Sequence, residues 1–198
     1  MIYCQHLLIF TSLALLLSSC ALKNTFATFG YTTPPHLLQP TQETTPVSLE
    51  IRDERKSEDV GYVQNGLGMK TARILPKQKV STILYHSLEN ALREKGFIVT
   101  PSSMKVLVII NKCFTDYDAQ LFGDRVVAKL DLTLHIVDPN EQLLYFKKIT
   151  TEGIESPIFL YNGKNTSKAL DRALLNAIRQ LFDDPHFFYT LKTKATTR

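Results

Sequence analysis

The sequence predicts an α+β protein, a two-layer sandwich in which a mostly antiparallel sheet carries two helices packed on one face. Two observations lead to this prediction. Several segments have apolar residues at every second position, which indicates strands, and two have them at i, i+3, i+4 and i+7, which indicates amphipathic helices. They follow in the order strand, helix, strands, helix, which is typical of a sheet covered on one side.

The first strand is predicted to begin at Val47, because Val47, Leu49 and Ile51 alternate with polar residues. A polar loop that contains glycines follows it, and residues 71–75 are predicted to return as a short strand.

The first helix is predicted over 77–95. Its apolar stripe consists of Val80, Ile83, Leu84, Ser87, Leu88, Ala91 and Leu92. Gly96 is well placed for the left-handed residue that ends many helices. Residues 97–99 leave the helix as a short extended piece.

Three longer strands are predicted at 106–114, 126–137 and 142–151. The first is apolar on both faces at its start, which favours a central position in the sheet. The second alternates strictly, and the turn cluster at 138–141 joins it to the third, which predicts a long hairpin.

The second helix is predicted to be capped by Asn165 or Thr166 and to end at Asp184-Pro185. Its stripe consists of Leu170, Ala173, Leu174, Ala177, Ile178 and Leu181. Phe187, Phe188 and Leu191 are expected to fold back on the core as an apolar coda.

The start of the chain differs from the rest. The first nineteen residues contain no Asp, Glu, Lys or Arg, and the apolar run 7–17 is too short to span a bilayer, which takes about 20 residues. Residues 1–19 are therefore predicted to be a signal peptide. Residues 20–46, rich in Thr and Pro, are predicted to be an extended tether, and residues 47–198 a single domain.

The stretch Leu17-Ser18-Ser19-Cys20 resembles a bacterial lipobox. The resemblance implies cleavage before Cys20 and acylation of its thiol, which makes Cys20 the membrane anchor. Ala21 is not the Asp that usually redirects this class, so the outer membrane is expected, with the domain facing the periplasm. The leader departs from the pattern in having no Lys or Arg near its start.

The amino-acid composition indicates which class of protein this is. Of 198 residues, 44% are hydrophobic and 21% charged, which is ordinary for a globular protein. The net charge of +4 is mild, and no block of Lys and Arg indicates a nucleic-acid partner. With three cysteines, one in the leader and one the predicted anchor, no internal disulfide framework is possible.

Motifs for catalysis or cofactor binding give no candidate. The glycine loop at 61–71 has Leu67 where a phosphate-binding loop needs Lys, and no helix is predicted after it. No His pairs with another ligand at a metal spacing, and Cys113 is interpreted as an inert core residue. We therefore expect no enzyme activity, cofactor or metal.

The candidate binding site is the loop after the first strand. Asp53 and Arg55 could fix it through a bidentate ion pair, although an exposed strand end explains them equally well. Gly61, Gly66 and Gly68 complete this candidate site.

The chain as a whole resembles the YajG family of uncharacterised envelope lipoproteins. The resemblance is carried by VSLEIRDERK (47–56), LENALREKGFIV (88–99), the VLVII strand and ALDRALLNAIRQLF (169–182). It implies an outer-membrane lipoprotein without an assigned activity or ligand. Two hypotheses follow: a non-catalytic binding or scaffold component that holds an envelope partner, or an accessory in lipid or lipopolysaccharide transport. A closed core and an exposed strand edge favour the first, and a cavity between the layers favours the second.

Overall fold

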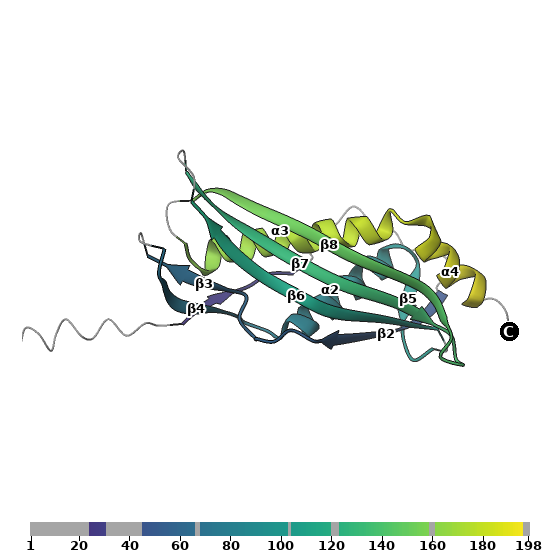
Figure 1. The fold of residues 1–198 in the computed structure, drawn as a ribbon. Helices are drawn as coiled ribbons and strands as arrows, with labels where there is room; N and C mark the ends of the chain where they lie inside the picture. Colours follow the sequence, from purple (N-terminus) through teal and green to yellow (C-terminus); the bar gives the residue numbers. More distant parts are fainter. Residues whose placement is uncertain are drawn as a thin grey trace, which may run out of the picture.

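The computed structural model describes residues 24–30, 45–65, 68–102, 104–119, 123–158 and 161–195. Figure 1 shows its layers, with the larger sheet in front of the helices. The elements are β1 (Thr25–Ala27), β2 (Thr45–Asp53), β3 (Gly61–Gln64), β4 (Lys70–Pro76), α2 (Val80–Glu94), β5 (Phe97–Val99), β6 (Lys105–Asp118), β7 (Asp124–Val137), β8 (Leu143–Ile158), α3 (Gly163–Phe182) and α4 (Pro185–Ala195).

The larger sheet has the strand order β5-β2-β6-β7-β8. β6, β7 and β8 form an antiparallel meander, which confirms the predicted long hairpin. β2 adds two parallel pairs, one with β5 and one with β6, because the connection through α2 returns the chain in the same direction as β2. The sheet curls around the helices that cover its inner face (Figure 1).

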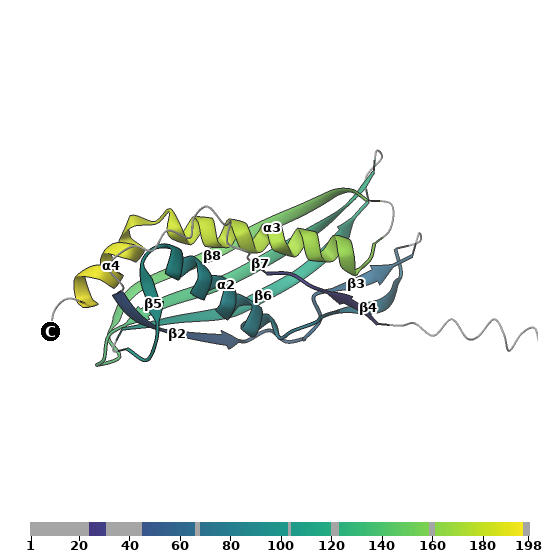
Figure 2. The same ribbon diagram turned by 180° about the vertical axis from the view of Figure 1, so that it is seen from behind.

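Helices α2 and α3 both cover the inner face, which confirms the predicted α+β class (Figure 2). Each turns its predicted stripe inward: every residue named for the two stripes is buried. Gly96 has the positive φ of 82° expected of a residue that ends a helix, and its N–H donates to the Arg93 carbonyl. The predicted cap of α3 is wrong, because the Asn162 side chain accepts from the N–H groups of Lys164 and Asn165 instead.

A second, smaller sheet has the order β1-β4-β3. The predicted polar loop thus contains a strand, β3, which pairs antiparallel with β4. β1 lies parallel to β4 within the stretch predicted as a tether, so that prediction is wrong for Thr25–Ala27. Three further hydrogen bonds fix this segment, from Lys77 N–H to the Ala27 carbonyl, from Thr28 N–H to Ser167 Oγ, and from Gly30 N–H to Asp171 Oδ1.

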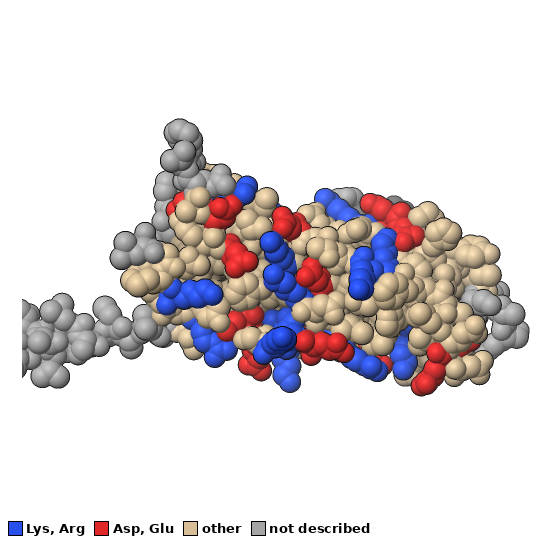
Figure 3. Space-filling model, viewed as in Figure 1, with Lys and Arg blue, Asp and Glu red and all other residues tan. Residues whose placement is uncertain are grey.

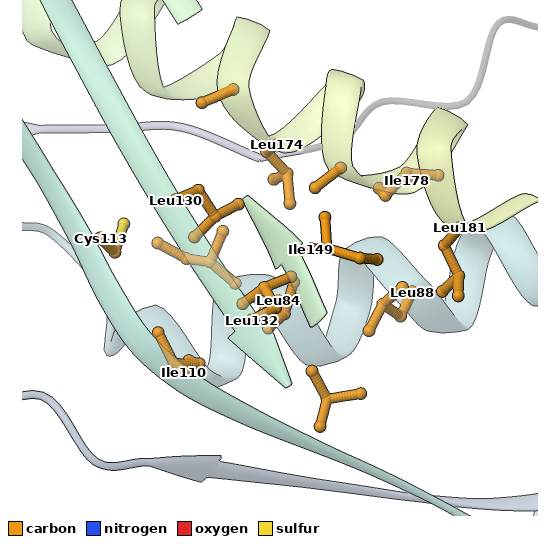
Figure 4. Packing of buried hydrophobic residues seen from close by; sticks show 14 of the residues in the cluster. Leu84, Leu88, Ile110, Cys113, Leu130, Leu132, Ile149, Leu174, Ile178 and Leu181 are labelled. Carbon is orange, nitrogen blue, oxygen red and sulfur yellow. The ribbon is translucent and has the colours of Figure 1, made fainter. Parts of the chain in front are cut away.

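The buried residues form one core between the sheet and the helices. Figure 4 shows side chains of both helices, among them Leu84 and Leu174, directed toward those of the central strands. Leu84, Leu130 and Leu174 surround one small cavity there. The predicted coda is a helix, α4, whose Phe187 and Leu191 are fully buried and extend this core at one end.

Among the described residues, no helix combines the length and apolar character needed to cross a membrane.

Candidate functional site

An open groove of about 650 Å³ lies where β2, β4 and α2 meet. Its walls are Phe26 of β1, residues 53–58 except Glu54, and residues 75–81, which run from the end of β4 into the first turn of α2. Three segments that are distant in the sequence therefore form it. It contains the Asp53 and Arg55 of the predicted binding loop.

Asp53 and Arg55 form the bidentate ion pair that their spacing allowed. Arg55 Nε donates to Asp53 Oδ1 over 2.9 Å and Nη2 donates to Oδ2 over 2.8 Å. The Arg55 backbone N–H also reaches Oδ1, and Nη1 donates to the Asp59 carbonyl. The Arg55 side chain is only 8% exposed, so the pair is a fixed part of the loop and not a free strand end.

Asp59 holds the far end of the same loop. Its buried carboxylate accepts hydrogen bonds from Ser57 Oγ, Tyr62 OH and Arg73 Nε. Burial by itself raises the pKa of this carboxyl, but the hydrogen bonds from Arg73, Tyr62 and Ser57 outweigh it and lower the pKa below its ordinary value. The loop is thus tied at both ends and presents a preformed surface to the groove.

The α2 side of the groove is positive. Lys79 occupies the position before the helix, its side chain makes no capping hydrogen bond, and the first turn contains no acidic residue. N–H groups at a helix start carry partial positive charge. Lys56 and Lys77 add two exposed cations to the lining.

Two of the predicted glycines, Gly61 and Gly68, do not line this groove. Gly61 begins β3, where an added Cβ would overlap the hydroxyl of Thr115 and lie 3.1 Å from Tyr161 OH. Its role is to let β3 approach β6. Gly68, with φ at +77°, lies in the β3–β4 connection with open space around it. Gly66, like the predicted anchor Cys20, lies outside the described residues.

The space between the layers is nearly filled. Its cavity measures about 10 Å³ and is lined by apolar side chains of α2, α3 and the central strands. A single water needs about 10–15 Å³, so an acyl chain does not fit there. This cavity between the described helices and strands is therefore too small to enclose a lipid, which favours a surface binding function.

The two edges of the larger sheet differ. α3 covers the β8 edge, because Asn176 donates to the Glu152 carbonyl and Arg172 to that of Ile154. On the opposite edge, β5 pairs with β2 only at 45–47. Within the described part of the chain, residues 48–53 of β2 have a strand neighbour on the β6 side alone. This open edge ends at the groove.

The described residues show neither a reactive cysteine nor a cluster of metal ligands. Cys113 is buried, as predicted, and burial raises the pKa of its thiol to about 12. Across the described ranges, no three His, Cys, Asp or Glu side chains are grouped as metal ligands. On the face drawn in Figure 3, acidic and basic side chains are interspersed without a large area of one sign.

Two parts of the groove wall were not predicted from the sequence. Phe26 belongs to a strand of three residues, too short to show a period. The helix predicted over 77–95 includes Lys77 and Lys79, whereas α2 begins at Val80 and leaves both lysines in the connection before it. A lysine pair just before a helix without an acidic first turn was the available signal.

Comparison with known proteins gives one family and a shared fold. A family model named Lipoprotein_16 and described as uncharacterized lipoprotein matches residues 32–192. This agrees with the predicted lipoprotein resemblance, while the narrower YajG assignment stays a prediction. No curated protein matches the chain.

Among solved structures, protein XCC0632 of Xanthomonas campestris, a DUF330 protein, superposes with a TM-score of 0.60 at 14% identity, over 88% of this chain and 100% of that one. Protein CT253 of Chlamydia trachomatis gives 0.44 at 8%, over 78% and 99%. A minor lipoprotein of Acinetobacter baumannii gives 0.39 at 12%, over 69% and 91%. At such identities, the first of these indicates a common fold and nothing further.

Proposed function

Because the chain belongs to this family of uncharacterized lipoproteins, we propose that it is a non-catalytic binding or scaffold component of the bacterial cell envelope. In this proposal Cys20 carries the lipid anchor after removal of residues 1–19, the anchor lies in the outer membrane, and the domain faces the periplasm. The LSSC stretch and Ala21 support the anchor and its destination.

The observation that carries this proposal is the contrast between a filled interior and an open groove. The interior cavity of about 10 Å³ holds no ligand larger than water, whereas the groove of about 650 Å³ is of the size of small-ligand and peptide sites. The groove wall is preformed by the Asp53–Arg55 pair and the Asp59 network. A preformed wall lowers the ordering cost of binding.

Two carboxylates of the loop, Asp53 in the groove wall and Asp59 outside the groove lining, support binding more than turnover. Asp53 is engaged by Arg55 of the loop and Asp59 by Arg73 of β4, so both carboxylates have their oxygens directed to partners within the protein. General acid or base catalysis needs a group within hydrogen-bond reach of a substrate. Neither carboxylate is presented in that way.

The alternative role in lipid or lipopolysaccharide transport has less support. A protein that carries a lipid by enclosing it needs an apolar cavity for the acyl chains, whereas the groove of this domain is polar and suits lipid headgroups. The open β2 edge adjoining the groove supports an extended protein partner instead.

A photo-crosslinking amino acid placed at Ser81 in the groove, in cells that make the full chain, tests the proposal. The matched position is Thr150, an exposed residue on β8. We expect adducts with a defined partner from Ser81 and none from Thr150. Equal adducts from both positions, or a reproducible turnover by the purified protein that one polar substitution removes, would contradict it.

The anchor has its own test. Cys20→Ser should leave an unprocessed precursor without lipid label, because the thiol is the acylated group. Mass spectrometry of the N-terminal peptide measures this directly. If the Ser variant is processed and stays with the membrane as before, the lipobox interpretation is wrong.

A further inference from the structure

The position of β1 limits how far the domain can stand from the bilayer. β1 is held by β4 on one side and by α3 on the other, through Ser167 and Asp171. Phe26 is only six residues after Cys20. Even a fully extended chain covers at most about 20 Å over six residues, so the groove wall at Phe26 lies within that distance of the anchor.

The groove has a net positive lining. The lining contains four cationic side chains and two carboxylates. The cations are Arg55, Lys56, Lys77 and Lys79, and the carboxylates are those of Asp53 and Glu58. Arg55 neutralises Asp53. No ion pair joins any of the three lysines to a carboxylate within the described part of the chain, so their charges are available to an anion.

An apolar strip borders these lysines. Phe26 is 54% exposed, and Leu75 and Pro76 extend the same wall. Aromatic and lysine side chains together are suited to a membrane interface, where a ring lies at the level of the headgroups and an ammonium group contacts phosphate.

Resting on the lipid anchor of the proposed function, we propose that this groove docks on the bilayer that holds the anchor and binds the anionic phosphate headgroups of its lipids. The lysines contact the phosphates, Phe26 lies at the interface, and the domain is held in one orientation on the membrane.

The bilayer is favoured over a soluble anion or peptide by the short connection to Cys20. A surface within about 20 Å of its own anchor meets headgroups at a far higher local concentration than any solute. Each lysine near an anionic surface changes membrane affinity by about 1 kcal/mol, which is roughly fivefold.

The test uses the full acylated protein reconstituted in vesicles, with a fluorophore on one introduced cysteine and a quencher on the lipid headgroups. Cys113 is buried, so the introduced thiol takes the label. The two positions are Gln78→Cys in the groove and Thr150→Cys on the sheet. The mass of the N-terminal cysteine, measured first, separates failure of the anchor from failure of docking.

We expect strong quenching at position 78 in vesicles that contain phosphatidylglycerol, weaker quenching with phosphatidylcholine alone, and little at position 150 in either. Lys77→Gln with Lys79→Gln should lower the ratio of docked to undocked protein roughly twenty-five-fold in anionic vesicles. The matched control, Lys95→Gln with Lys148→Gln, removes the same charge from the other end of α2 and from β8, and should leave quenching unchanged.

Three results would overturn the proposal. The first is equal quenching at positions 78 and 150. The second is the same response from the groove variant and the control variant. The third is release of the label from the surface by soluble inorganic phosphate at an ionic strength matched with chloride, which identifies a site for a free anion.

Discussion

Helix α2 borders two spaces that differ in almost every property. Along its length it packs on the sheet and leaves an apolar cavity of about 10 Å³. At its first turn it opens on a groove of about 650 Å³ with charged walls. The two sides of α2 therefore have different tasks. The packed core along the helix supplies stability, and the groove at its first turn is open to a ligand. Substitutions on the two sides should therefore have separable effects.

The largest effect is expected at two neighbouring residues of β1, one buried in the core and one exposed in the groove. Ala27 is fully buried and Phe26 is 54% exposed in the groove. Ala27→Asp should lower the free energy of unfolding by about 3–5 kcal/mol, because it buries an unpaired charge. Phe26→Asp should cost less than about 1 kcal/mol. Chemical denaturation measures both. Equal losses would mean that β1 is not part of the core.

A smaller loss is expected within the stripe of α2. Leu88 is 3% exposed, and Leu88→Ala should cost about 2–5 kcal/mol, from the lost transfer energy and the cavity left behind. Arg93 lies on the outer face and forms an exposed pair with Glu89, so Arg93→Ala should cost about 0.5 kcal/mol or less. Urea midpoints at constant slope give the two values. A reversed order would refute the assigned buried face.

Two glycines of the smaller sheet and its β3–β4 connection compare a packed position with an open one. Gly61→Val should cost about 1–3 kcal/mol, because the new side chain meets Thr115 and Tyr161 in the interior. Gly68→Ala meets open space and should cost only the strain of its positive φ, about 1 kcal/mol. Thermal unfolding distinguishes them. If Gly68→Ala proved the worse of the two, the packing role of Gly61 would be refuted.

The stability of the loop beside the groove should depend on pH through the carboxyl group of Asp59. Its pKa is lower in the folded protein than its ordinary value, so its contribution to stability is present above that ordinary value. The contribution is lost as the pH falls through the lower, folded value. Acid titration of the Tyr62 ring signal by NMR follows this loss, because Tyr62 OH donates to Asp59. Asp59→Asn should abolish the titration, and its persistence in that variant would assign it elsewhere.

The smallest effect on stability is expected at the groove lysines. Lys77→Gln with Lys79→Gln should change the free energy of unfolding by no more than about 0.5 kcal/mol, because both side chains are exposed and make no ion pair within the described residues. Thermal and chemical unfolding check this. A large loss would mean that the lysines support the fold, and the two spaces would no longer be separable.

The sequence predicted best those elements whose burial repeats along the chain. The stripes of α2 and α3 and the alternation of β7 identified their buried residues, because one face of each meets a single core. The ion pair of Asp53 and Arg55 was also foreseeable, since it joins residues two positions apart. Local spacing was sufficient in these cases.

Features that depend on contacts between distant segments could not be predicted from the sequence. β1 is too short to have a period and becomes a strand only through β4 and α3. The helix α3 begins at Gly163, a poor helix former, so the cap at Asn162 was not recognised. The groove joins residues near 26, 55 and 78, and no local pattern reveals such a meeting.

The attachment of β1 also determines how a mechanical load enters the domain. Tension applied to the chain before Thr25 acts first on the hydrogen bonds of β1 with β4, and then on those of Thr28 and Gly30 with α3. Pulling from that end slides β1 lengthwise past β4, so its ladder is loaded in shear and its bonds share the force.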